Sequence, residues 1–116
     1  MVALIAAVVL AAPPKATLST TSATAPLVLS SWCWNAQCGA PFSSSKKTVI
    51  AARGSTVYVR LGFVPRHLRV AIAGKQVAVS RSGRVVIWAA ARGGGVTVHA
   101  TGPRGWATYV ARLKVS

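Results

Sequence analysis

Short runs in which apolar and polar residues alternate recur along this chain and limit what it can fold into. The clearest run is TVYVRLGF, residues 56–63, in which every second residue is apolar. Successive side chains of an extended strand point to opposite faces, so this run places its apolar side chains on one face. Gly, Pro and Ser residues, which favour turns, interrupt such runs at intervals of about 8 to 12 residues. The pattern predicts half-buried strands rather than helices.

Seven or eight strands are expected in a folded part of about 90 residues that starts near residue 26. They cover residues 27–34, 46–52, 56–63, 67–73, 76–80, 85–90, 96–101 and 106–115. Each strand has an apolar face to bury, and two packed antiparallel sheets bury such faces. We therefore expect an all-β fold, a small antiparallel β-sandwich. The alternative is a small open barrel of the OB type.

The number and spacing of the strands over residues 26–115 resemble those of known extracellular modules. In this respect the chain is similar to bacterial immunoglobulin-like and fibronectin-type-III-like β-sandwich modules. The resemblance implies an immunoglobulin-like arrangement of strands and a binding or structural role outside the cell. The antibody-type disulfide is not expected, because Cys33 and Cys38 are too close in sequence to bridge two sheets around a core tryptophan.

The 116 residues contain no Asp and no Glu, whereas 14 Lys and Arg give a formal net charge of +14. The basic residues are scattered and make up an ordinary 12% of the chain, so the charge results from the missing acids. Glycosidase chemistry needs a carboxylate pair, and a Ser-His-Asp triad needs an acid that orients its histidine. We therefore expect a protein that is not an enzyme and uses no cofactor.

Metal binding is not expected either. Ca²⁺ and Mg²⁺ sites would lack their carboxylate ligands. Cys33 and Cys38 are separated by four residues, while His67 and His99 fall on different expected strands, which does not match the spacing of a zinc site. Both histidines fall at outward strand positions, where the ordinary histidine is solvated and inert. The alternative is a pH switch, although two more protons would add little contrast to a chain with a net charge of +14.

An apolar run, VALIAAVVLAA at residues 2–12, precedes the expected domain. It is too short to cross a bilayer, which takes about 20 residues, and suits the core of a secretory signal peptide. Cleavage after Ala12, Ala16 or Ala25 would follow a small residue. No Lys or Arg precedes the run, so we expect either a signal that is weak in this region or a true start that lies upstream. The alternative to a signal peptide is a buried first strand or helix.

Three segments are therefore predicted: a signal peptide over residues 1–16, extending to 25 at most, a Ser/Thr/Ala-rich linker over 17–25, and a β-sandwich domain over 26–116. A leader of this kind predicts a secreted, extracellular or cell-envelope location. Export favours disulfides, and Cys33 and Cys38 are predicted to form one worth about 2 kcal/mol. The alternative, a redox pair, is usually spaced C-x-x-C beside a helix N-terminus.

Trp32 and Trp34 flank Cys33 and share one face of the expected strand. Together with Trp106 they are candidates for aromatic contact with a sugar or a base, the alternative being packing next to the disulfide.

Six basic residues are the candidates for binding an anion. Four of them fall at outward strand positions, and the other two form the only adjacent basic pair: Arg60, Arg69, Arg112, Lys114, Lys46 and Lys47. Arg60 need not share a sheet with Arg112 and Lys114, since the order of the strands is unknown. With no acid to offset the bases, anionic partners should be attracted in a salt-dependent way.

The predicted function is therefore that of a secreted or surface-associated module that associates with anionic cell-envelope polymers or lipid head groups. The first alternative is a protein–protein adhesion or spacer module whose charge is incidental. The second is nucleic-acid binding, against which export and the scattered bases argue.

Overall fold

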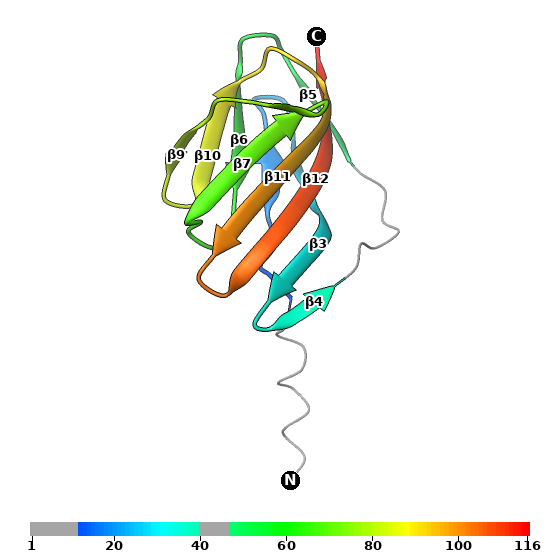
Figure 1. Cartoon of the computed structure of the whole chain (residues 1–116). Helices are drawn as coiled ribbons and strands as arrows, with labels where there is room; N and C mark the ends of the chain where they lie inside the picture. The colour runs from blue at the N-terminus through cyan, green and yellow to red at the C-terminus, as the bar shows by residue number, and fades with distance from the viewer. Residues whose placement is uncertain (1–11, 40–46) are drawn as a thin grey trace.

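Two β-sheets lie face to face in this computed structural model, which describes residues 12–39 and 47–116 (Figure 1). The smaller sheet has five strands in the order β2-β1-β6-β10-β9. The larger has the order β4-β3-β12-β11-β7-β8, with a seventh strand, β5, paired to β12. An all-β sandwich is thus confirmed, and the barrel alternative is wrong because the strands divide into two open sheets.

The smaller sheet consists of β1 (Thr17–Ser19), β2 (Thr24–Pro26), β6 (Thr56–Arg60), β9 (Ser80–Ser82) and β10 (Val85–Ala89). The larger consists of β3 (Val28–Trp34), β4 (Gln37–Gly39), β5 (Thr48–Ala51), β7 (His67–Ile72), β8 (Lys75–Gln76), β11 (Gly94–Gly102) and β12 (Gly105–Val115). The β5–β12 pair is parallel and the others are antiparallel. The described residues hold more strands than the expected eight, because five strands have only two or three residues.

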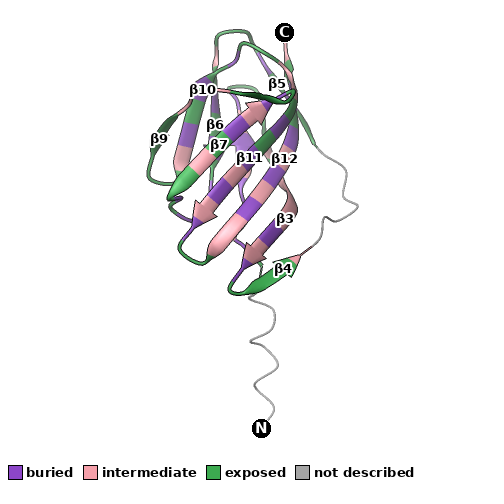
Figure 2. Cartoon of the chain, in the orientation of Figure 1, coloured by how far each residue is buried: buried purple, intermediate pink, exposed green. Residues whose placement is uncertain are grey.

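The predicted alternation of inward and outward side chains is present in the long strands. In β6, Val57 and Val59 are fully buried and the residues on either side of each are exposed. Figure 2 shows the same alternation along β7, β11 and β12. The inner faces of both sheets meet in one core, whose largest fully buried side chains include Tyr109, Leu18, Leu61, Ile72 and Leu113. Burial of each such side chain stabilises the fold by about 1.5–3 kcal/mol.

The segment that precedes residue 26 belongs to the sandwich, unlike the linker expected over residues 17–25. Strand β1 pairs with β2 on one side and with β6 on the other. Ala16 and Leu18 lie in the core, and the hydroxyl of Tyr109 donates a hydrogen bond of 2.6 Å to the carbonyl of Pro14. The folded domain therefore includes residues from Pro14 onward. The apolar run that predicts a signal peptide lies, apart from Ala12, outside the described residues.

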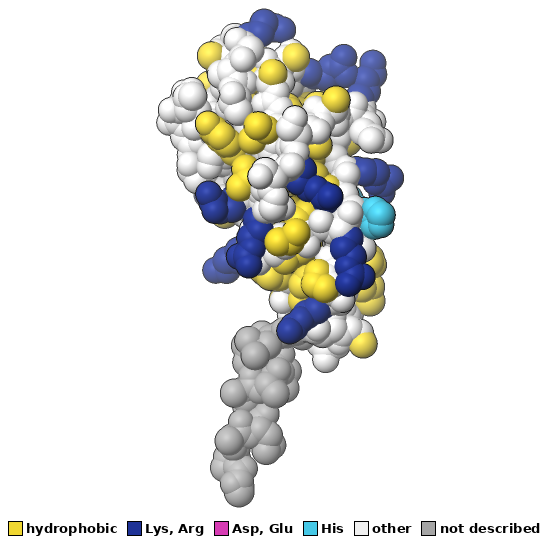
Figure 3. Space-filling view, turned by 90° about the vertical axis from the view of Figure 1, so that its left-hand side faces the viewer, with side chains coloured by type: hydrophobic (Ala, Val, Ile, Leu, Met, Phe, Trp, Pro, Cys, Tyr) yellow, Lys and Arg dark blue, Asp and Glu magenta, His cyan; other side chains and the backbone are white. Residues whose placement is uncertain are grey.

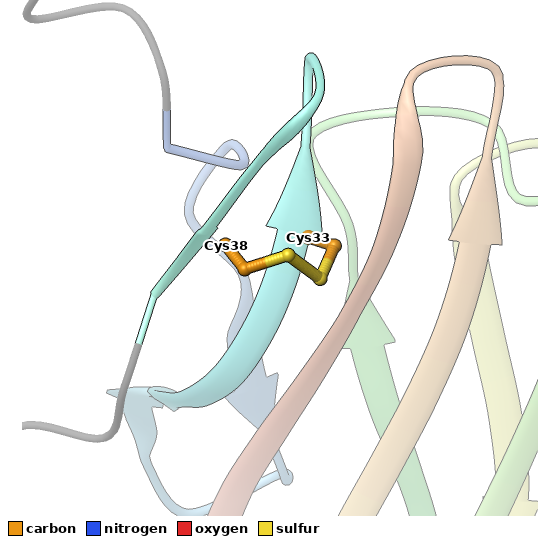
Figure 4. Close-up of a disulfide and its surroundings, with 2 residues drawn as sticks. All are labelled: Cys33 and Cys38. Atoms are coloured by element: carbon orange, nitrogen blue, oxygen red, sulfur yellow. A yellow bond between two sulfur atoms is a disulfide. The ribbon is translucent and has the colours of Figure 1, made fainter.

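A tight hairpin of β3 and β4 contains the disulfide (Figure 4). Cys33 and Cys38 are directly opposite each other in the two strands and are bonded, which confirms the predicted pair. Asn35 and Ala36 form the two-residue turn with φ of 53° and 63°, the positive values that a type I′ hairpin requires. The disulfide indicates an oxidising environment.

Gly105 allows this hairpin to approach the last strand. Its φ is +146°, and a Cβ atom at this position would overlap the carbonyl of Cys33 on β3. A glycine is therefore required where β12 begins beside β3.

Within the described ranges, 12–39 and 47–116, no helix is long and apolar enough to cross a membrane.

Candidate anion-binding face

The outer face of the larger sheet brings together four of the nine candidate residues, Arg69, Trp106, Arg112 and Lys114. Strands β7, β11 and β12 are neighbours, and their register aligns outward side chains in rows across the sheet. We call the outward side chains of these three strands the cationic face. Its members are His67, Arg69, Ala71, Gly95, Thr97, His99, Thr101, Trp106, Thr108, Val110, Arg112 and Lys114.

Two basic side chains lie on the outer face where β12 approaches its end, and the backbone of a third basic residue lies beside them. Arg112 and Lys114 are exposed on the same face of β12, and residues two apart in a strand are separated by about 7 Å. The amide of Arg112 donates a hydrogen bond of 3.0 Å to the carbonyl of Lys47, which places the backbone of Lys47 beside that of Arg112. Lys46 lies outside the described residues.

Arg69 lies on the same face, two strands away. It is exposed on β7 and pairs with His99 of β11, which in turn pairs with Thr108 of β12. The adjacent row contains His67, Thr101 and Trp106, followed by Cys33 of β3. Arg69 is therefore surrounded by imidazole and hydroxyl groups.

Arg60 is not part of this arrangement. It lies on β6 in the smaller sheet and its cross-strand neighbours are Thr17 and Val85. The outer face of that sheet exposes 42% of Tyr58 and 37% of Ile87. Figure 3 shows further Lys and Arg side chains, separated by hydrophobic ones, on the side of the sandwich that carries β9.

Trp32 and Trp34 are core residues, which corrects the interpretation of these two side chains as surface contacts. Their exposed fractions are 9% and 4%, and the ring of Trp34 lies 4.9 Å from that of Phe63. Cys33 occupies the outward position between them, so the alternation of the strand turns both indoles inward. The alternative interpretation, in which both tryptophans pack next to the disulfide, is therefore the one that describes them.

Trp106 is the tryptophan of the cationic face, and it stacks on His99 with ring centroids 5.4 Å apart and an angle of 29° between the planes. Nδ1 of His99 lies 2.9 Å from Oγ1 of Thr108. Burial lowers the pKa of His99, and the positive charge of Arg69 lowers it further. Both effects favour the neutral imidazole of His99, while Arg69 carries the positive charge of this row.

Sequence reasoning treated His99 as an inert surface histidine and missed these contacts. The turn at Gly102 to Gly105 is the sequence feature from which these contacts could have been predicted. A two-residue turn fixes the register of a hairpin, and counting back from the pair Gly102–Gly105 places His99 opposite Thr108.

The cationic face can attract an anion and donate hydrogen bonds to it. In the part of the chain that the structure describes, no group of three or more His, Cys, Asp or Glu is arranged to hold a metal ion. Comparisons with protein-family models, with curated proteins and with solved structures found no match for this chain. The function must therefore be argued from the geometry and the charge of this face.

Proposed function

We propose that this protein is an exported, non-enzymatic module that binds anionic polymers of the cell envelope through its cationic face. The observation that carries this proposal is the placement of Arg69, Arg112 and Lys114 on the outer face of one sheet. The chain contains no acidic side chain to neutralise them. Exposed charges act on anions within a Debye length, about 10 Å at 0.1 M salt. A hydrogen-bonded sheet holds these charges at fixed spacings, which suits the repeated anions of a linear polymer.

The order of the strands supports an immunoglobulin-like sandwich. Such domains have the order ABED in one sheet and CFG in the other. When β2 to β5 and β8 are left out, the remaining strands can be lettered A to G in chain order. The order β1-β6-β10-β9 then corresponds to ABED, and β7-β11-β12 corresponds to CFG. Strands β2 to β5 then form an insertion between the first and second strands. This insertion places the disulfide hairpin and β5 beside the last strand of the larger sheet.

Export is supported by the apolar run at residues 2–12 and by the disulfide. Because Ala16 and Leu18 belong to the core, cleavage after Ala16 or Ala25 would remove buried side chains or β1 itself. We therefore propose that the leader is cleaved after Ala12 or at an earlier residue. N-terminal sequencing of the exported protein tests this, and a start at residue 17 or 26 would contradict it.

Two triple variants of equal charge test the binding face. The first is Arg69→Ala, Arg112→Ala and Lys114→Ala, and the second is Arg60→Ala, Arg84→Ala and Arg92→Ala. Each lowers the formal net charge of +14 by three, and all six side chains are exposed. An exposed charge contributes about 0.2–1 kcal/mol, so the first variant should be retained about tenfold more weakly on isolated cell envelope.

The second variant should stay within about twofold of the unmodified chain, because Arg60 and Arg84 lie on or beside strands of the smaller sheet and Arg92 lies beside Trp88 at the side of the sandwich. Equal losses of retention in both variants would mean that binding depends on the net charge of the protein and not on a particular face. No loss in either would favour the adhesion or spacer function, in which the charge is incidental.

A further inference from the structure

A depression in the cationic face has a lining suited to a single anionic group. It is bordered by His67, Leu68, Arg69, His99 and Thr101. It lies where β7 and β11 run side by side, with Arg69 opposite His99 and His67 opposite Thr101. Four of its five side chains can donate hydrogen bonds, and no carboxylate side chain exists in this chain to occupy it.

We infer that this depression is a subsite for one phosphate group and that it takes up a proton when the phosphate binds. The inference rests on the proposed function, because the phosphate is taken to belong to the anionic polymer. The guanidinium of Arg69 supplies a permanent charge with a fork of donors that matches phosphate oxygens. The hydroxyl of Thr101 and the two imidazoles add donors from other directions, which suits a tetrahedral anion better than a planar carboxylate.

His99 is held in position to respond to such an anion. Its Nδ1 is engaged with Thr108 and its ring is stacked on Trp106. Nε2 is therefore the nitrogen that remains for a ligand, and it makes no hydrogen bond within the described residues. A protonated imidazole at this position would donate from Nε2 to a phosphate oxygen.

The groups around His99 explain why an anion would change its charge. Arg69 and His67 on β7 are the neighbours that carry or can acquire charge, and the other side chains that face the ring are Thr97, Thr101, Trp106 and Thr108. The charge of Arg69 disfavours the imidazolium form. A phosphate bound to Arg69 would offset that charge and raise the pKa of His99. A phosphodiester, whose single negative charge does not titrate in this range, should therefore bind more tightly as the pH falls and His99 takes up its proton, by about tenfold.

Nuclear magnetic resonance of the two histidine rings in the full chain tests the subsite, with dimethyl phosphate as the probe because its charge is constant over the titration. The ring signals are followed against pH in dimethyl phosphate and in chloride at equal ionic strength, and His67→Asn assigns them. Dimethyl phosphate should raise the titration midpoint of His99 by about one pH unit, which corresponds to tenfold coupling. Arg69→Ala should abolish this shift, and Arg112→Ala should leave it in place.

Equal midpoints in dimethyl phosphate and in chloride would overturn the subsite, and so would a shift that survives Arg69→Ala. Failure of the subsite is distinguishable from failure of the proposed function. Unchanged midpoints together with retention on the cell envelope contradict the subsite alone. A raised midpoint without retention supports the subsite and contradicts the envelope polymer as its source of phosphate.

Discussion

The two sheets of this sandwich have similar inner faces and different outer faces. Inside, both contribute alternate apolar side chains that are fully buried, such as Val59 of β6 and Val98 of β11. Outside, the larger sheet carries Arg69, Arg112 and Lys114, whereas the smaller sheet carries Arg60 together with exposed Tyr58 and Ile87. Folding requires the inner faces to be apolar and leaves the outer faces free to differ. The difference between the outer faces is therefore the better guide to function.

The largest expected effect is a difference in stability between variants of two tryptophans, one on the inner face and one on the outer face of the larger sheet. Trp34→Ala should lower the free energy of unfolding by about 3–5 kcal/mol, because it removes a buried indole that packs on Phe63. Trp106→Ala should change it by less than about 1 kcal/mol. Chemical denaturation of both variants measures the difference. Similar losses would show that the inner and outer faces are not energetically distinct.

A high-pH experiment tests how the inner face of β12 holds the N-terminal segment. Burial raises the pKa of Tyr109 to about 12, whereas an unfolded tyrosine loses its proton near pH 10. Between these two values the unfolded chain has lost the proton and the folded chain retains it, so stability falls as pH rises. The loss should reach about 2 kcal/mol between pH 10 and pH 12.

Tyr109→Phe is the matched control for this effect. It lacks the ionising group and the hydrogen bond to Pro14, so it should be less stable at neutral pH and lose less stability at high pH. Identical slopes above pH 10 for the two proteins would contradict the assignment to Tyr109.

Removal of the disulfide should affect stability without affecting the cationic face. Cys33→Ser with Cys38→Ser opens a short loop, which should lower stability by about 2 kcal/mol. The hairpin pairs with the first half of β12, from Gly105 to Val110, whereas Arg112 pairs with β5 and Arg69 lies on β7. Retention on cell envelope should therefore be unchanged under conditions where the variant is folded. A folded variant that is no longer retained would show that the hairpin is part of the binding surface.

The smallest effect is expected in acid. Acid unfolding usually reflects carboxylates that are paired in the native state, and this chain has no acidic side chain. The lowered pKa of His99 makes a small contribution. An unfolded histidine gains its proton near pH 6.5 and the folded one at lower pH, so stability is lost as pH falls between the two values. The thermal midpoint should otherwise stay nearly constant down to about pH 3, and a steep loss that persists in His99→Gln would contradict this reasoning.

Local alternation was enough to predict the fold class and the long strands. The expected strands at residues 56–63 and 67–73 contain β6 and β7, and the expected strand at 106–115 covers all of β12 except Gly105. Strands β1 and β2 were missed because each has three residues and Leu18 is the only large apolar side chain in either. A pattern so short becomes a strand only when β6 pairs with it, and this pairing is not encoded locally.

The candidate site could be predicted only in part, for the same reason. The alternation of apolar and polar residues correctly predicted that the side chains of Arg69, Arg112 and Lys114 point outward. Their presence on one face depends on β11 lying between β7 and β12, which is a property of the strand order. Alternation also placed Trp34 and Cys33 on opposite faces without showing which face was the inner one. That choice depends on how β3 docks against β12.

Retention of the full chain on isolated cell envelope during a salt titration, with nucleic acid as competitor, tests the central claim most directly. A module that binds envelope anions through the cationic face should be retained at low salt and lost steeply as salt rises. The competitor should not displace it. Retention that is absent or insensitive to salt would contradict the account, and displacement by nucleic acid at matched salt would identify a different anionic partner.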